Sequence, residues 1–131
     1  MKRLSIIPAL FAALALTACA GGGAQAATDA IRTVSGAEAE ALIAQAENYV
    51  IVDVRTPEEF AAAHVAGAIN IPVETIADAP AALANKDQTI FLYCRSGNRS
   101  AQAAGKLAQL GYTDLVDFGG LSGWPGEVEA G

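Results

Sequence analysis

Apolar and polar residues alternate in short blocks from residue 31 onward. Apolar runs rich in β-forming residues predict five strands, at about residues 31–34, 49–54, 68–71, 89–93 and 115–118. Apolar positions at helical spacing predict three helices, at about 35–47, 56–63 and 99–110. Because strands and helices alternate at short spacing, we expect one α/β domain with a central parallel sheet and helices on both faces.

Local signals support these boundaries. Ser35 followed by Glu38 is typical of a capping box, and Thr56-Pro57-Glu58-Glu59 combines a cap, a first-turn proline and an acidic first turn. Gly111 is expected to close the third helix. The segment 72–85 is predicted to be loop with one or two helical turns around Glu74 and Leu83.

The segment from Thr89 to Ser100 carries the clearest chemical signal. A predicted strand ends at Cys94, a short polar loop with Gly97 follows, and an alanine-rich helix begins behind it. In parallel sheets ligands bind beyond the carboxyl ends of the strands, which is where Cys94 is expected. Inward-facing N–H groups, the helix dipole, Arg95 and Arg99 would stabilise a thiolate there. The pattern favours a loop that holds a small anion against a nucleophilic sulfur over a buried structural cysteine.

The sequence Cys94-Arg95-Ser96-Gly97-Asn98-Arg99-Ser100 resembles the active-site loop of the rhodanese, or thiosulfate sulfurtransferase, domain. Residues 53–60 and 64–72 resemble the upstream signature of that family, and residues 119–124 resemble its downstream signature. Ala63 and Ala66 stand where the family often has glycine and proline, so the loop around His64 is expected to differ in shape. The resemblance covers roughly residues 31–126.

This resemblance implies a sulfurtransferase with Cys94 as its catalytic residue. We expect the Cys94 thiolate to take the outer sulfur of thiosulfate, to carry it as a persulfide, and to pass it to a thiol, to cyanide or to a sulfur-acceptor protein. Gly97 is expected to supply a backbone conformation that a side chain resists. The expected cradle for the donor consists of Arg95, Ser96, Gly97, Asn98, Arg99 and Ser100. No cofactor is expected.

Other functions fit parts of the same pattern. Cysteine phosphatases also hold an anion on a strand–loop–helix. Their loop has the pattern Cys-x5-Arg, whereas position 100, where that arginine would stand, is serine here. The loop closed by Arg99 is one residue shorter, which favours a single transferred sulfur over a phosphoryl group. A membrane-tethered persulfide carrier, or a rhodanese-like binding module without turnover, remains an alternative, since the sequence alone cannot separate a carrier from an enzyme.

The polar residues outside the loop are expected to be structural. Arg55 lies where it can pair with Glu58 or Glu59, and Asp53 precedes it at a strand end. His64 is not needed as a base if the loop already stabilises the thiolate, and Trp124 is expected to pack near the pocket rim. No cluster of His, Cys, Asp or Glu has the spacing of metal ligands, so no metal is expected.

The amino terminus resembles an export signal. Lys2 and Arg3 precede an apolar run from Leu4 to Leu16, which is too short to span a bilayer but suits a signal peptide. Leu16-Thr17-Ala18-Cys19 then resembles the lipobox of bacterial lipoproteins, which implies cleavage before Cys19 and lipid attachment to its sulfur. Cleavage after Ala26 by a soluble-export peptidase is the alternative, but that site is far from the apolar run.

These segments predict the organisation of the chain. We expect a lipoprotein signal peptide at 1–18, a flexible tether at 19–29, a rhodanese-like domain at 30–126 and a tail at 127–131. A tether of about ten residues reaches roughly 16–19 Å from a membrane. The expected location is the bacterial cell envelope or periplasm, on the outer membrane in a Gram-negative cell because alanine follows Cys19. Cys94 would then be the one free thiol in an oxidising compartment.

The charge of the chain narrows its partners. The 131 residues carry a net charge of −6, which becomes −8 if Lys2 and Arg3 leave with the signal peptide. An acidic body of this kind argues against nucleic acid as a partner. The anion-binding loop must therefore act as a local positive focus on a negative protein.

Overall fold

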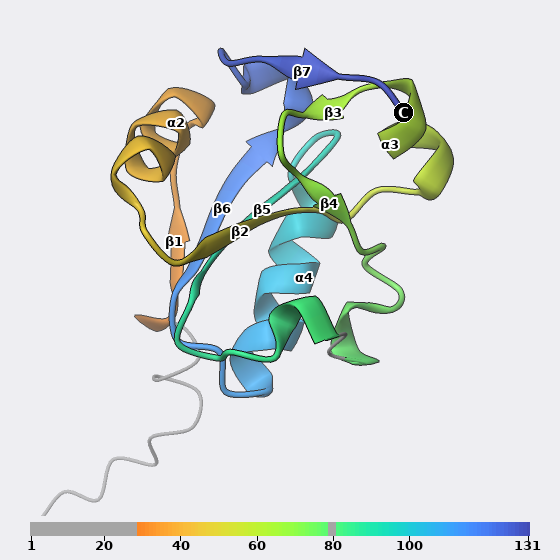
Figure 1. The fold of residues 1–131 in the computed structure, drawn as a ribbon. Coiled ribbons are helices and arrows are strands. Elements are labelled where there is room, and N and C mark those ends of the chain that lie inside the picture. The colour runs from red at the N-terminus through yellow and green to blue at the C-terminus, as the bar shows by residue number, and fades with distance from the viewer. Residues whose placement is uncertain (1–28, 79–80) are drawn as a thin grey trace, which may run out of the picture.

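The fold is a five-stranded parallel sheet with helices on both faces (Figure 1). A computed structural model describes residues 29–78 and 81–131, so the expected signal peptide, Cys19 and most of the expected tether lie outside the described residues. The strands are β1 Ile31–Thr33, β2 Tyr49–Asp53, β4 Ile69–Asn70, β5 Thr89–Cys94 and β6 Leu115–Gly120. Their order in the sheet is β1-β6-β5-β2-β4. This arrangement confirms the predicted fold class.

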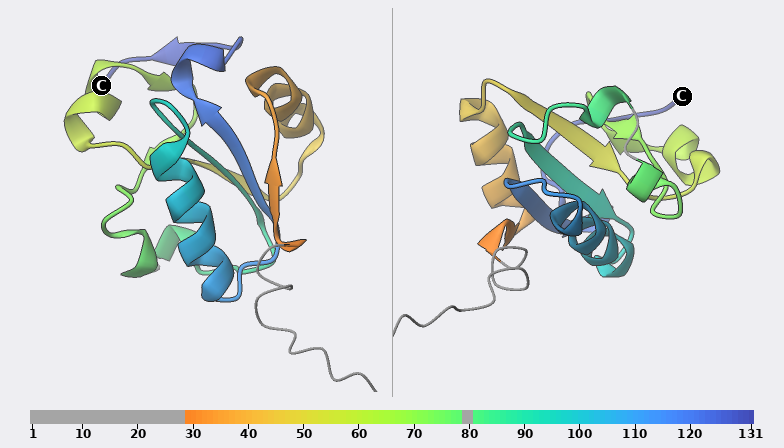
Figure 2. Two further views of the ribbon diagram at one scale, coloured as in Figure 1. Left: turned by 180° about the vertical axis from the view of Figure 1, so that it is seen from behind. Right: turned by 90° about the horizontal axis from the view of Figure 1, so that it is seen from below.

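Helices pack on both faces of the sheet. The α-helices are α2 Gly36–Gln45, α3 Pro57–Ala62 and α4 Asn98–Gln109, and the 3-10 turns are η1 Ile76–Asp78, η2 Ala81–Leu83 and η3 Leu121–Gly123. Helices α2 and α4 lie on opposite sides of the sheet (Figure 2). The predicted capping boxes at Ser35 and Thr56 are both present. Within the described ranges, no helix has the length and apolar character needed to cross a membrane.

The central strand β5 shows why the sheet is buried on both faces. Ile90, Leu92 and Cys94 pack with the core that α4 covers, and Phe91 and Tyr93 pack on the opposite side with the core that includes α2. A parallel strand covered on both faces needs a nearly continuous apolar sequence, which Thr89 to Cys94 supplies. The last of these buried positions is the cysteine, so the core fixes the place where its sulfur lies.

A second, small sheet was not predicted. Strand β3, His64–Val65, pairs antiparallel with β7, Val128–Glu129. The backbone N–H of Gly131 also donates to Ala61 O at 2.9 Å, so the segment expected to be a tail packs on the domain. Strands of two residues are too short to show an alternating pattern, so no sequence pattern predicts this pairing.

Tyr93 joins the two sheets through one hydrogen bond. Its ring is fully buried, and the backbone N–H of Val65 donates to its hydroxyl at 2.9 Å. We expect Tyr93→Phe to lower the free energy of unfolding by about 1–3 kcal/mol, because a buried N–H loses its acceptor. Tyr49→Phe, at a side chain that is 40% exposed, is the control and should change little. Urea unfolding measures both, and an equal effect of the two variants would contradict this role.

Candidate active site

The loop after β5 holds the sulfur of Cys94 at the start of α4. Gly97 is the N-cap of α4, has φ 97° in the left-handed region, and makes no side-chain cap. Because glycine has no side chain to cap the helix, the N–H groups of its first turn remain free for another acceptor. The Gly97 N–H donates to Cys94 Sγ at 2.9 Å. The helix start therefore uses the sulfur as its cap.

The thiol of Cys94 is buried yet acidified. Only 1% of Cys94 is exposed. Burial raises the pKa of the thiol, but hydrogen bonds from the backbone N–H groups of Ser100, Gly97 and Ser96 outweigh it and hold the pKa below its ordinary value. This is the activated thiol that the sequence predicted, although the direct donors are mainly backbone N–H groups rather than arginines.

Ser100 connects the sulfur to a buried carboxylate. Its Oγ lies 3.7 Å from Cys94 Sγ and donates to Asp117 Oδ1 at 2.7 Å. The same carboxylate oxygen accepts the Gly119 N–H at 3.0 Å. Asp117 was not predicted as a site residue. Its position near the carboxyl end of the strand next to β5 is the signal that would have found it.

Arg99 is held by an ion pair. Its guanidinium donates to both carboxylate oxygens of Glu59, at 2.8 and 3.0 Å. The hydrogen bond to Glu59 is the main reason why the pKa of Arg99 is raised, and the negative charge of Cys94 adds to it. The same hydrogen bond lowers the pKa of Glu59 to about 2. Arg99 thus adds positive charge near the sulfur, and Glu59 fixes the position of the Arg99 guanidinium.

Arg55 pairs with Asp53, which corrects the predicted pairing with Glu58 or Glu59. Arg55 Nε and Nη2 donate to the Asp53 carboxylate over 2.6 to 3.0 Å, and Nη2 also donates to Ala63 O at 2.6 Å. The hydrogen bond from Arg55 to Asp53 is the main reason why the pKa of Arg55 is raised. Both side chains are buried, and Glu59 is instead engaged by Arg99.

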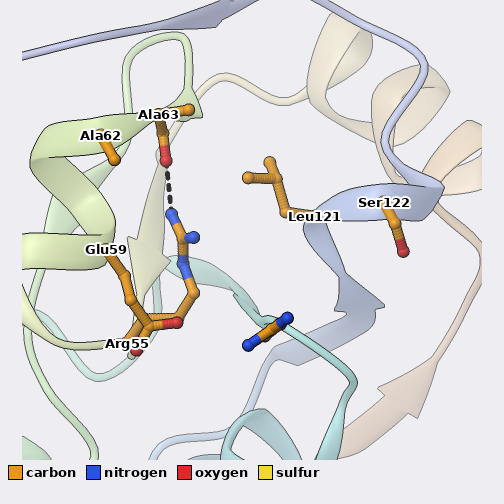
Figure 3. A pocket seen from close by; sticks show the side chains of 7 residues that line it. Arg55, Glu59, Ala62, Ala63, Leu121 and Ser122 are labelled. Atoms are coloured by element: carbon orange, nitrogen blue, oxygen red, sulfur yellow. Dashed lines mark hydrogen bonds between the residues drawn. The ribbon is translucent and has the colours of Figure 1, made fainter.

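A cleft of about 530 Å³ opens beside this loop. Figure 3 shows α3 residues and Arg55 on one side and the η3 turn on the other. The lining residues are Arg55, Glu59, Ala62, Ala63, Arg95, Leu121 and Ser122. Arg95 is exposed and, among the described residues, takes part in no ion pair. The cleft therefore presents a cation to any small anion that approaches the loop.

Residues 35–127 match the family described as the rhodanese-like domain. The chain belongs to this family. Thiosulfate sulfurtransferase PspE of Escherichia coli (strain K12) is 42% identical over 71 residues, which cover 53% of this chain and 68% of that protein. Thiosulfate sulfurtransferase GlpE of Pseudomonas entomophila (strain L48) is 34% identical over 97 residues, which cover 70% of this chain and 88% of that protein.

Solved structures agree with this assignment. A rhodanese with anions from E. coli is 37% identical and has a TM-score of 0.61, over 63% of this chain and 99% of that chain. Its α/β fold is the fold described above. The family and its sulfurtransferase relatives support sulfur transfer as the general chemistry of this rhodanese-like domain.

The other residues of the predicted cradle lie around the rim of the loop. Ser96 and Asn98 are exposed, and Asn98 Oδ1 accepts from Gln102 Nε2 at 3.4 Å, so its side chain contacts the outside of α4. Among these two residues, only the Ser96 N–H is directed at the sulfur. The structure brings together Cys94, Gly97, Ser100 and the N–H of Ser96, and places Arg95 in the adjoining cleft.

His64 and Trp124 lie outside this constellation. The His64 ring stacks on Phe60 with centroids 3.7 Å apart, and its Nε2 lies 3.2 Å from Glu129 Oε1. Trp124 packs against Phe118 at 5.3 Å and donates from Nε1 to Glu127 O at 3.1 Å. Each side chain thus packs on an aromatic ring and also lies within hydrogen-bond distance of a residue near the carboxyl end. Across 29–78 and 81–131, no three His, Cys, Asp or Glu side chains are grouped so that they could hold a metal ion.

Gly120 keeps β6 close to the loop. A Cβ at this position would lie 2.3 Å from Arg95 O, a distance at which the backbone must move. The glycine therefore lets the end of β6 support the loop from behind. This explains part of the Gly119-Gly120 sequence that resembles the family signature.

The acidity of Cys94 can be measured by its alkylation. We expect the rate to rise with pH through an inflection below the ordinary thiol value of about 8.5, since the loop stabilises the thiolate. Arg99→Ala should raise that inflection because a nearby positive charge is lost. Arg32→Ala, which removes an exposed arginine from an ion pair with Asp114, is the matched control and should leave it unchanged. A wild-type inflection at or above about 8.5 would contradict the activated thiol.

Proposed function

We propose that this rhodanese-like domain is a thiosulfate sulfurtransferase that works through a persulfide on Cys94. The observation that carries this proposal is the thiol held at the start of α4 by backbone N–H donors, with the pKa of Cys94 below its ordinary value. The relatives named thiosulfate sulfurtransferase support the choice of donor. Because Cys94 is almost fully buried, the site also favours a small donor over a bulky one.

The reaction has two displacement steps. The Cys94 thiolate attacks the outer sulfur of thiosulfate, a bond forms between the two sulfurs, and the bond to the sulfonate breaks, so that sulfite leaves with the electron pair. The thiolate of an acceptor, or cyanide, then attacks the terminal sulfur of the persulfide. The Cys94 sulfur leaves as a thiolate, and the acceptor becomes a persulfide or thiocyanate. No external oxidant or reductant is needed.

The residues of the loop divide this work. The N–H groups of Ser96, Gly97 and Ser100 stabilise the anionic sulfur before and after each step. Arg95 in the cleft attracts the dianionic donor, and Arg99, fixed by Glu59, adds positive charge near the sulfur. On a chain with a net charge of −6, these cations give the local attraction that an anionic donor needs.

Phosphoryl transfer is disfavoured by the residue at position 100. Where a phosphatase of the Cys-x5-Arg type carries arginine, this chain has Ser100, whose Oγ is bound to the carboxylate of Asp117 at 2.7 Å. Without an arginine at position 100, the loop lacks the guanidinium that holds the phosphate oxygens in those enzymes. We therefore assign sulfur transfer to this loop.

We also propose that the protein is exported and anchored to a membrane by a lipid on Cys19. The support is the sequence Leu16-Thr17-Ala18-Cys19 after an apolar run. We expect the mature chain to begin at Cys19 with added acyl mass and to fractionate with membranes, and Cys19→Ser to lack that mass. Intact mass spectrometry checks both. A wild-type chain that begins at Ala27 without acyl mass would contradict the anchor.

The sulfur-transfer proposal predicts a covalent adduct. Incubation with thiosulfate should add the mass of one sulfur to the domain, cyanide should remove it, and Cys94→Ser should prevent it. Aryl phosphates should be poor substrates. Steady-state transfer with thiosulfate and 3-mercaptopyruvate then measures donor preference.

The other results of that experiment distinguish the alternatives. An adduct that forms but does not turn over with any acceptor would favour a persulfide carrier. Absence of an adduct with every donor, together with rapid hydrolysis of aryl phosphates, would contradict sulfur transfer. Absence of both activities would favour a binding module.

A further inference from the structure

Asp117 is a buried carboxylate that the two displacement steps do not use. It lies in β6, where only 5% of it is exposed, and its neighbours along the strand, Val116 and Phe118, are apolar core residues. Burial of a carboxylate is costly unless hydrogen bonds compensate. The donors that compensate here are the Gly119 N–H and the hydroxyl of Ser100. The second of these donors also contacts the sulfur of Cys94.

Ser100 has one hydroxyl proton and three acceptors around it. Its Oγ lies 2.7 Å from Asp117 Oδ1, 3.1 Å from Gly97 O and 3.7 Å from Cys94 Sγ. The carboxylate oxygen, at the shortest distance, is the strongest of these acceptors. The proton therefore points to Asp117, and the lone pairs of Ser100 Oγ remain for the S–H of Cys94. This arrangement favours the thiol, because a thiolate would face the oxygen without its proton.

We propose that Asp117 is a positioning residue that controls the ionisation of Cys94 through Ser100, by holding the Ser100 hydroxyl proton away from Sγ. When the sulfur ionises, Ser100 must turn its proton from Asp117 to Sγ, or the thiolate must rely on the backbone N–H groups alone. Asp117 thus opposes the effect of the loop N–H groups on the acidity of Cys94. It keeps the Cys94 thiolate from becoming too weak a nucleophile.

The other charged groups around Cys94 are already engaged or act in the opposite direction. Arg99 of α4 adds positive charge, and Glu59 of α3 binds it, while Glu74 also acts on Arg99. Asp53 of β2 is bound to Arg55, and Arg95 lies in the cleft. Among the described residues around the sulfur, Asp117 is the carboxylate linked to it through a single hydroxyl.

The effect of Asp117 on the acidity of Cys94 has opposite consequences for the two steps of the proposed reaction. A thiolate of lower pKa is a poorer nucleophile but a better leaving group. Without Asp117, uptake of sulfur by the fully ionised thiolate should become slower, and release of Sγ from the persulfide should become faster. The consequence rests on the proposed function, whereas the effect on thiol acidity does not.

The test is a double-mutant cycle on the pH dependence of Cys94 alkylation. Asp117→Asn replaces the carboxylate by a weaker, neutral acceptor, so Ser100 can turn its hydroxyl proton to Sγ, and the inflection should fall by about one pH unit, a tenfold change in the ratio of thiolate to thiol. In a Ser100→Ala background the same substitution should lower it distinctly less, because only the charge effect remains. Asp114→Asn, the same change at the other end of β6, should have no effect.

Ser100→Ala alone gives an independent result if Asp117→Asn does not fold. Since Asp117 holds the hydroxyl proton of Ser100, removal of this hydroxyl should leave the inflection unchanged or slightly lower. A rise of about one pH unit would mean that Ser100 already donates to the thiolate, and would overturn the proposal. No shift in Asp117→Asn, or an equal shift with and without Ser100, would also overturn it.

Single-turnover kinetics with thiosulfate and with an acceptor thiol add a readout that a purely structural role would not move. Above the inflection, Asp117→Asn should slow sulfur uptake about threefold for a fall of one pH unit, and should speed sulfur release. A change of both rates in the same direction would contradict the proposed role of Asp117. Wild type that takes up no sulfur would contradict the proposed function alone, since the alkylation cycle needs no sulfur donor.

Discussion

The functional end of this domain depends on one constraint, which is that the N-cap residue of α4, Gly97, has no side chain to cap the helix, and the sulfur of Cys94 takes that place. Gly97 makes this possible, because its left-handed backbone turns its N–H to within 2.9 Å of Sγ. Strand β5 places the cysteine from the other side, since its alternating side chains are buried on both faces of the sheet. The thiolate is stabilised because the end of β5 and the start of α4 hold Sγ beside backbone N–H groups.

The charged groups around the loop are arranged so that few of them act directly on the sulfur. Asp53 binds Arg55, Glu59 binds Arg99, and Asp117 accepts from an N–H and a hydroxyl. These partners stabilise buried or partly buried charges that would otherwise be costly. The cleft cation that takes part in no ion pair among the described residues is Arg95. Attraction of an anion and stabilisation of a thiolate are thus carried out by different groups.

The parts that sequence could predict are those set by local pattern. The apolar runs located the five parallel strands, the capping signals at Ser35 and Thr56 located two helices, and the Cys94 loop was found from the strand, glycine and helix around it. The parts that it missed depend on packing between distant segments. Arg55 pairs with Asp53 rather than with Glu58 or Glu59, Arg99 reaches Glu59 from 40 residues away, and the contact of Asp117 with Ser100 needs the pairing of β5 with β6.

The measurement that tests the account most directly is the pH titration of individual backbone amides by ¹⁵N-edited NMR. If N–H groups of the loop stabilise the anionic sulfur, the amide protons of Ser96, Gly97 and Ser100 should shift together as Cys94 ionises, with the midpoint found for alkylation. In Cys94→Ser the same amides should show no such transition. Wild-type amides that do not respond to the ionisation of Cys94 would contradict the claim that this loop was built around an anionic sulfur.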